Sequence, residues 1–92
     1  MELRNKTAIV TGVSKGIGLA TVMALLEEGA TVVGWGRTAP QIDHESFLFI
    51  ETDVRNFTSV EHAYEKTVSK VGDDIAVLIN NAGLGYEGYL TD

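Results

Sequence analysis

The chain has 92 residues, of which 45% are hydrophobic, and a formal net charge of −6. Its length allows one domain, and its composition is typical of a folded globular protein rather than a disordered one. The seven basic residues are scattered and there is no cysteine, which argues against nucleic acid as a partner and excludes disulfides, thiolate zinc sites and Cys nucleophiles.

Membrane and metal partners are also not expected from the sequence. No apolar run is long enough to cross a bilayer, and the N-terminal segment lacks the apolar core of a signal peptide. We therefore expect a soluble, cytoplasmic protein. His44 and His62 have no second ligand at metal spacing, so we expect both on the surface and no metal site.

Four short apolar runs, the first of them rich in β-branched residues, predict β-strands. They are Thr7–Thr11, Thr31–Trp35, Phe47–Glu51 and Ile75–Asn80. We expect Trp35 to pack in the core rather than to stack on a base.

Two segments between these strands have helical spacing. The first is Gly16–Glu28, where Gly29 is a plausible stop. Its predicted apolar side consists of Ile17, Ala20, Ala24 and Leu25. The second begins at a capping box of Thr58 and Glu61 and closes at Gly72.

Strands of unbroken apolar residues that alternate with helices favour an α/β fold with a parallel sheet covered on both faces. The connection Arg37–Ser46 is too short for a full crossover helix. We expect a loop or a single helical turn there.

Three glycines, Gly12, Gly16 and Gly18, lie where the first strand gives way to the first helix. A strand, a glycine-rich turn and a helix together present free backbone N–H groups and the positive end of the helix dipole to an anion. Gly12 would permit the tight turn, Gly16 would leave room for a phosphate, and Gly18 would let the helix pack closely. A glycine-rich turn that binds nothing is the alternative.

Three motifs, in order along almost the whole chain, resemble the short-chain dehydrogenases/reductases. Thr11–Gly18 reads T-G-V-S-K-G-I-G, Asp53-Val54 follows the third strand, and Asn80–Gly83 reads N-N-A-G after the fourth. The resemblance implies a Rossmann-type, doubly wound parallel sheet with strand order 3-2-1-4. Residues 1–92 would form the N-terminal portion of a single NAD(P)-binding domain.

The resemblance also implies roles for the matched residues. Ser14 and Lys15 would reach the phosphates and the adenosine ribose, and the N–H of Ile17 would meet the pyrophosphate. Asp53, with Val54, would accept a hydrogen bond from the adenine amino group. The cofactor's ribose would be lined by Asn81, Ala82 and Gly83.

Arg37 bears on the choice between the two cofactors. It stands where an acid would pair with the ribose hydroxyls of NAD, and a guanidinium can hold a 2′-phosphate bidentately. We therefore expect NADP(H) rather than NAD(H), although Asp43 or Glu45 could still fold back toward the ribose.

The family's catalytic Ser and Y-x-x-x-K have no counterpart here, because no lysine lies four residues after Tyr64, Tyr86 or Tyr89. The complete protein would interconvert a small carbonyl compound and its alcohol by hydride transfer, and this chain alone would be inactive. A non-enzymatic dinucleotide sensor is the alternative. Because Ile75–Asn80 would be an apolar edge strand, we also expect a homo-oligomer or complementation by a chain that carries the C-terminal half.

Overall fold

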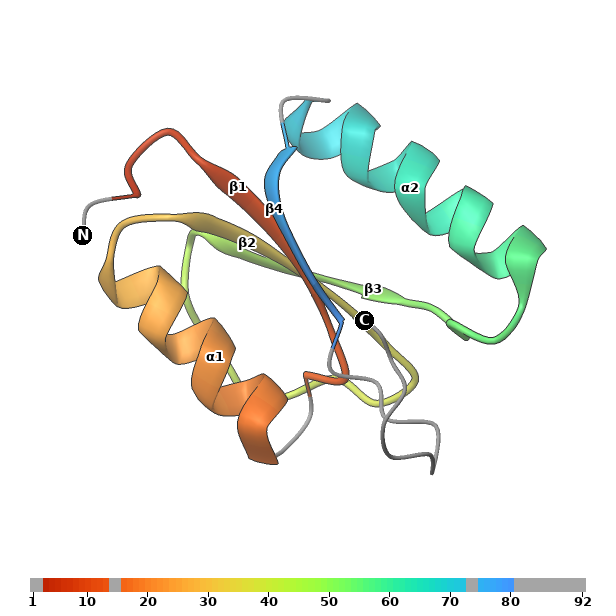
Figure 1. Ribbon diagram of the computed structural model, residues 1–92, viewed down its shortest axis with the longest axis horizontal. Helices are drawn as coiled ribbons and strands as arrows, with labels where there is room; N and C mark the ends of the chain where they lie inside the picture. The colour runs from red at the N-terminus through yellow and green to blue at the C-terminus, as the bar shows by residue number, and fades with distance from the viewer. Residues whose placement is uncertain (1–2, 14–15, 73–74, 81–92) are drawn as a thin grey trace.

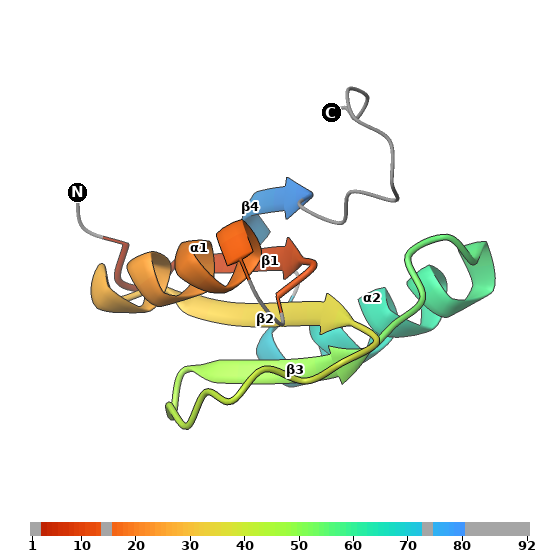
Figure 2. The same cartoon turned by 90° about the horizontal axis from the view of Figure 1, so that it is seen from below.

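Four parallel strands form the sheet in a computed structural model that describes residues 3–13, 16–72 and 75–80. The strands are β1 (Thr7–Thr11), β2 (Thr31–Gly36), β3 (Phe47–Glu51) and β4 (Ile75–Asn80). Across the sheet their order is β3-β2-β1-β4, and all neighbours run parallel. Figure 2 shows the four strands side by side in this order.

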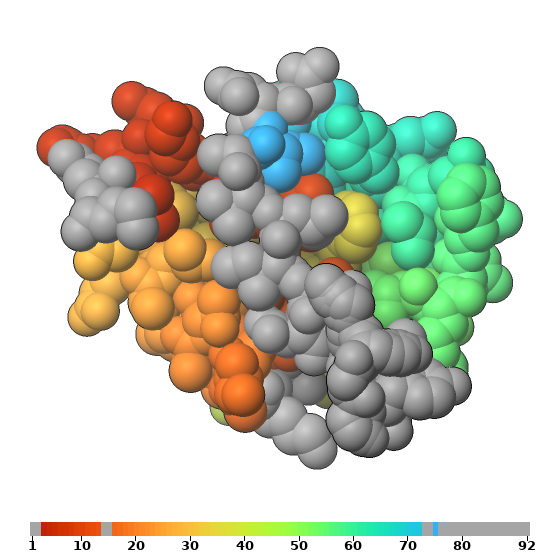
Figure 3. Space-filling model, viewed as in Figure 1, coloured from red at the N-terminus to blue at the C-terminus, as the bar shows by residue number. Residues whose placement is uncertain are grey.

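Two helices cover the two faces of the sheet. Helix α1 (Gly16–Glu27) follows β1, and α2 (Phe57–Val71) follows β3. Figure 1 shows them on opposite faces, and the space-filling view shows their surfaces on opposite sides of the molecule (Figure 3). The α/β class with a parallel sheet covered on both faces is therefore confirmed.

The hydrophobic core consists of two layers, because successive strand residues point to opposite faces. Val10 and Val32 pack with Val22 and Leu26 on the α1 side. On the α2 side the buried residues are Ile9, Val33, Trp35, Ile50 and Ala63. Val10, Val22, Val32 and Val33 are completely excluded from solvent.

The predicted apolar side of α1 is wrong. The buried residues are Gly18, Val22 and Leu26 at four-residue spacing, whereas Ile17 is 76% exposed. Ala20 and Ala24 are exposed as well, and only Leu25 of the predicted side packs against the core. Because α1 carries apolar residues on more than one side, periodicity does not select the buried face; the close approach at Gly18 does.

The predicted capping box of α2 is also wrong. The N-cap is Asn56, whose side-chain oxygen accepts a hydrogen bond from the Ser59 N–H at 3.0 Å, so Thr58 and Glu61 lie inside the helix. The other end is confirmed. Gly72 caps the helix with a φ of +87°, and its N–H donates to the Val68 carbonyl at 2.8 Å.

The short connection between β2 and β3 is an irregular loop without a helix, as expected. Ile42 within it packs against the α1-side core. None of the helices in the described ranges has the length and apolarity that crossing a membrane requires.

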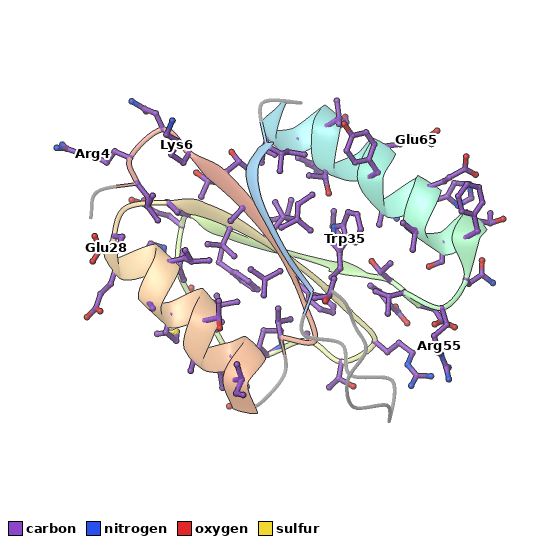
Figure 4. All side chains as sticks on the ribbon, viewed as in Figure 1. Arg4, Lys6, Glu28, Trp35, Arg55 and Glu65 are labelled. Carbon is purple, nitrogen blue, oxygen red and sulfur yellow. The ribbon has the colours of Figure 1, made fainter. Side chains whose placement is uncertain are left out.

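Trp35 is a core residue, as expected, and it joins the sheet to α2 (Figure 4). Its indole Nε1–H donates to Thr67 Oγ1 at 3.1 Å, and that hydroxyl donates in turn to the Ala63 carbonyl at 2.8 Å. Both side chains are buried. The indole N–H therefore obtains a partner inside the core, where an unpaired donor would be costly.

Thr67→Val tests this link, because it preserves the shape of the side chain and removes the acceptor of the indole N–H. We expect it to lower the free energy of unfolding by about 1–3 kcal/mol, measured by urea denaturation followed by circular dichroism. Thr21→Val is the matched control, since Thr21 Oγ1 makes the same kind of helical bond to the Ile17 carbonyl at 2.7 Å but is not buried. Equal effects of the two substitutions would contradict the assigned role of Thr67.

Strand β4 lies at the edge of the described sheet, with β1 as its one neighbour there. We propose that the chain pairs along this edge with a second chain, because an unpaired parallel edge offers N–H and C=O groups to another strand. Light scattering after size-exclusion chromatography is expected to give a mass above 9.9 kDa that rises with concentration. A monodisperse species of the monomer mass at every concentration would refute this.

Candidate cofactor site

The carboxyl ends of β1, β2 and β3 meet at one edge of the sheet. There the Gly12 N–H donates to the Trp35 carbonyl at 3.1 Å, and the Thr52 N–H donates to the Gly36 carbonyl at 2.7 Å. These bonds continue the pairing beyond the strands and hold the three following turns together. In open α/β sheets ligands bind at this edge.

The turn after β1 is shaped by glycine at three positions. Gly12 and Gly16 have φ values of +65° and +64°, which L side chains rarely adopt. A Cβ at Gly18 would lie 1.7 Å from the Gly12 carbonyl oxygen, so only glycine lets α1 approach the turn this closely. The tight turn at Gly12 and the close packing at Gly18 are confirmed.

The start of α1 can receive an anion. A Cβ built at Gly16 would have no described atom within 4 Å, so the space beside this backbone is open. The first turn of a helix leaves N–H groups without intrahelical partners and carries the positive end of the dipole. Ile17 and Gly18 belong to this turn, which therefore has the geometry and polarity of a phosphate site.

Two charged residues follow the neighbouring strands at the same edge. Exposed Arg37 comes directly after β2, and Asp53 comes two residues after β3, with half-buried Val54 beside it. The Arg55 N–H bonded to the Asp53 carboxyl lowers the pKa of that group, and the charges of Arg55 and Arg37 lower it further. Asp53 is therefore an acceptor whose ionised form is favoured, with the Arg55 guanidinium in contact with it.

Sequence reasoning missed two residues of this site. Arg55 donates from its backbone N–H and its Nε to Asp53 Oδ1, at 3.0 and 3.3 Å, and Ser59 Oγ accepts from the Asp53 N–H at 2.9 Å. An Asp followed two residues later by Arg is a spacing that could have indicated the first contact, because Asp side chains often bond the backbone N–H two residues on.

The structure thus brings together seven of the residues that the sequence proposed for cofactor binding. They are Gly12, Gly16, Ile17, Gly18, Arg37, Asp53 and Val54. Ser14, Lys15, Asn81, Ala82 and Gly83 lie outside the described residues. Within residues 3–13, 16–72 and 75–80, no three His, Cys, Asp or Glu side chains come together as they would around a metal ion.

Comparison with known proteins identifies relatives over nearly the whole chain. A family model described as short chain dehydrogenase matches residues 6–91. Coniferyl-alcohol dehydrogenase of a Pseudomonas species is 37% identical over 84 residues, which is 91% of this chain and 31% of that enzyme. The chain thus spans about a third of the length of the curated relatives that it matches first.

Solved structures show the same likeness. Ligand-free aldohexose dehydrogenase of Thermoplasma acidophilum matches with a TM-score of 0.79 and 36% identity, over 87% of this chain and 30% of that one. A short chain dehydrogenase of Leptospira borgpetersenii with bound NAD⁺ matches with a TM-score of 0.77 and 25% identity, over 86% and 32%.

Gly18→Ala tests the close contact in the turn. Because the added Cβ would meet the Gly12 carbonyl, we expect α1 to shift or the chain to unfold, with a loss of more than about 3 kcal/mol in the free energy of unfolding. Gly36→Ala is the matched control, since its nearest described neighbour would lie at an ordinary 3.8 Å. Urea denaturation measures both, and equal stability of the two variants would contradict the contact.

Proposed function

The chain belongs to the short-chain dehydrogenase family, and we propose that it forms the adenosine-diphosphate-binding half of the cofactor site in an NADP(H)-dependent oxidoreductase. When bound, the nicotinamide would donate hydride to a small carbonyl compound or accept it from the corresponding alcohol in the complete protein. The residues of this chain bind and orient the cofactor. The proton donor and the substrate pocket belong to the remainder of the protein.

The contact between Gly18 and the Gly12 carbonyl is the observation that carries this proposal. It brings the first turn of α1 to the carboxyl end of β1, and the open space at Gly16 is where a side chain would otherwise exclude a phosphate. Backbone N–H groups at this position supply donors without the entropy cost of ordering side chains. The pyrophosphate is therefore the part of the cofactor that this turn suits.

The preference for NADP(H) rests on Arg37. It follows β2 directly, and its charge reaches Asp53 across the edge of the sheet. Arg37 can donate two parallel hydrogen bonds to two of the three terminal oxygens of a 2′-phosphate. NAD lacks this phosphate and offers the same donors only neutral ribose hydroxyls, which are weaker acceptors.

Support also comes from the path of the loop that contains Asp43 and Glu45. The Ser46 carbonyl accepts from the Val32 N–H at 2.9 Å, so the loop has returned to the amino end of β2 by Ser46. Asp43 and Glu45 lie within three residues of Ser46, near the edge opposite to Arg37. A carboxylate from this loop is thus poorly located to pair with ribose hydroxyls at the carboxyl edge.

Titration calorimetry with NADP⁺ and NAD⁺ tests the assignment. We expect this chain to bind NADP⁺ more tightly than NAD⁺. Arg37→Ala should lower the affinity for NADP⁺ by about 10–100-fold, because it removes a charge-assisted contact of about 1.5–3 kcal/mol. The affinity for NAD⁺ should change by less than about 2-fold, because NAD⁺ has no phosphate at that position.

Lys6→Ala is the matched control for the loss of one positive charge. Lys6 is exposed and precedes β1, at the end of the sheet opposite to Arg55 (Figure 4). It should leave both affinities unchanged. Tighter binding of NAD⁺ by the unmodified chain, or an equal loss for both nucleotides in Arg37→Ala, would refute the preference for NADP(H).

A further inference from the structure

The turn between β3 and α2 holds Asp53 at several points. Oδ1 of its carboxylate accepts from the backbone N–H of Arg55 at 3.0 Å and from the Arg55 Nε at 3.3 Å. Its own N–H donates to Ser59 Oγ at 2.9 Å, and its carbonyl accepts from the Asn56 N–H at 2.9 Å. Backbone and side chain are therefore both fixed, the side chain chiefly by Arg55.

The ion pair between the side chains of Asp53 and Arg55 adds little to stability. The side chains of Asp53 and Arg55 are 38% and 55% exposed, and ion pairs in water at that exposure contribute little. Both hydrogen bonds to the carboxylate from described residues end on the same oxygen, Oδ1. Its second oxygen, Oδ2, is thus the one that the turn leaves for a ligand, in an orientation that the guanidinium maintains.

We propose that Arg55 is a positioning residue that makes this site select adenine over 6-oxopurines, by preventing the Asp53 carboxylate from turning. The inference rests on the proposed function and on the role that the family resemblance implies for Asp53, whose carboxylate would accept a hydrogen bond from the adenine amino group. Adenine has an amino donor at C6. Hypoxanthine and guanine have an oxygen there, which repels a carboxylate, and they place their nearest donor one ring atom away, at N1.

Selectivity then depends on whether the carboxylate can follow the donor. A freely rotating carboxylate can turn from the C6 position to the N1–H of a 6-oxopurine and recover most of the lost interaction. A carboxylate whose Oδ1 accepts from both the backbone N–H and the guanidinium of Arg55 must give up both bonds to do so, and substitution of the Arg55 side chain removes only the second. Arg55 therefore makes the binding of a 6-oxopurine less favourable and leaves the binding of adenine unchanged.

The pH dependence follows from the same groups. The Arg55 N–H, the Arg55 guanidinium and Arg37 all lower the pKa of Asp53. A lowered pKa keeps the carboxylate ionised as the pH falls, so the preference for adenine is present above that pKa and is lost below it. Removal of the guanidinium leaves the backbone hydrogen bond and the charge of Arg37 in place. The pKa of Asp53 then rises but stays below that of a free Asp, and the pH at which the preference for adenine is lost rises with it.

Competition between NADP⁺ and its hypoxanthine analogue, deamino-NADP⁺, tests the proposal in Arg55→Gln and Arg55→Lys. We expect the unmodified chain to prefer NADP⁺ by about 10-fold or more, and Arg55→Gln to narrow this preference to about 3-fold or less. Arg55→Lys should restore part of it, because an ammonium can still pair with Oδ1. The pH at which half of the preference is lost should rise in Arg55→Gln.

Lys70→Gln is the matched control, because it removes a positive charge from the last turn of α2, at the far end of the helix. It should leave the preference unchanged. If the unmodified chain binds neither nucleotide, the proposed function fails, and this inference with it. If the chain binds both but lacks the preference for adenine, or if Arg55→Gln keeps it, the inference alone is refuted.

Discussion

The rest of the site depends on the contact between the first turn of α1 and the turn after β1. A Cβ at Gly18 would overlap the Gly12 carbonyl oxygen, so the helix is located as closely as backbone atoms allow. This approach fixes the rotation of α1 about its axis. Val22 and Leu26 lie on the same side of the helix as Gly18 and are buried, whereas Ile17 lies on another side and is exposed. The same contact brings the positive end of α1 to the edge of the sheet, where an anion can reach it.

Backbone hydrogen bonds then gather the specific side chains at that edge. The bonds from Gly12 to Trp35 and from Thr52 to Gly36 hold the turns after β1, β2 and β3 in line. Trp35 is fixed on the other side through Thr67 of α2. The turns that carry Arg37 and Asp53 therefore lie at the same edge of the sheet because the parallel pairing requires it, and the ion pair of Asp53 and Arg55 need not contribute to folding.

Features with local causes could be predicted from the sequence, and features that depend on competition between neighbours could not. The strands and the glycine turn could be predicted, because each follows from the residues of one short segment. An apolar run favours a strand, and glycine readily adopts the positive φ values that the turn needs. The N-cap of α2 could not, because Asn56 and Thr58 are both able to cap. Asn56 prevails here, where Ser59 is bound on one side by its Oδ1 and on the other by the Asp53 N–H.

The site divides its work between backbone and side chains. In the function that we propose, the glycine turn offers N–H groups to a pyrophosphate, which every dinucleotide cofactor contains, and the turn cannot change without moving α1. Arg37 and Arg55 are exposed, and the backbone of their turns is held by bonds that do not involve their side chains. Substitution of these side chains can alter which ribose phosphate or base is preferred, with little effect on the free energy of unfolding. Specificity in this half of the site can therefore vary independently of the fold, whereas the capacity to bind a diphosphate cannot.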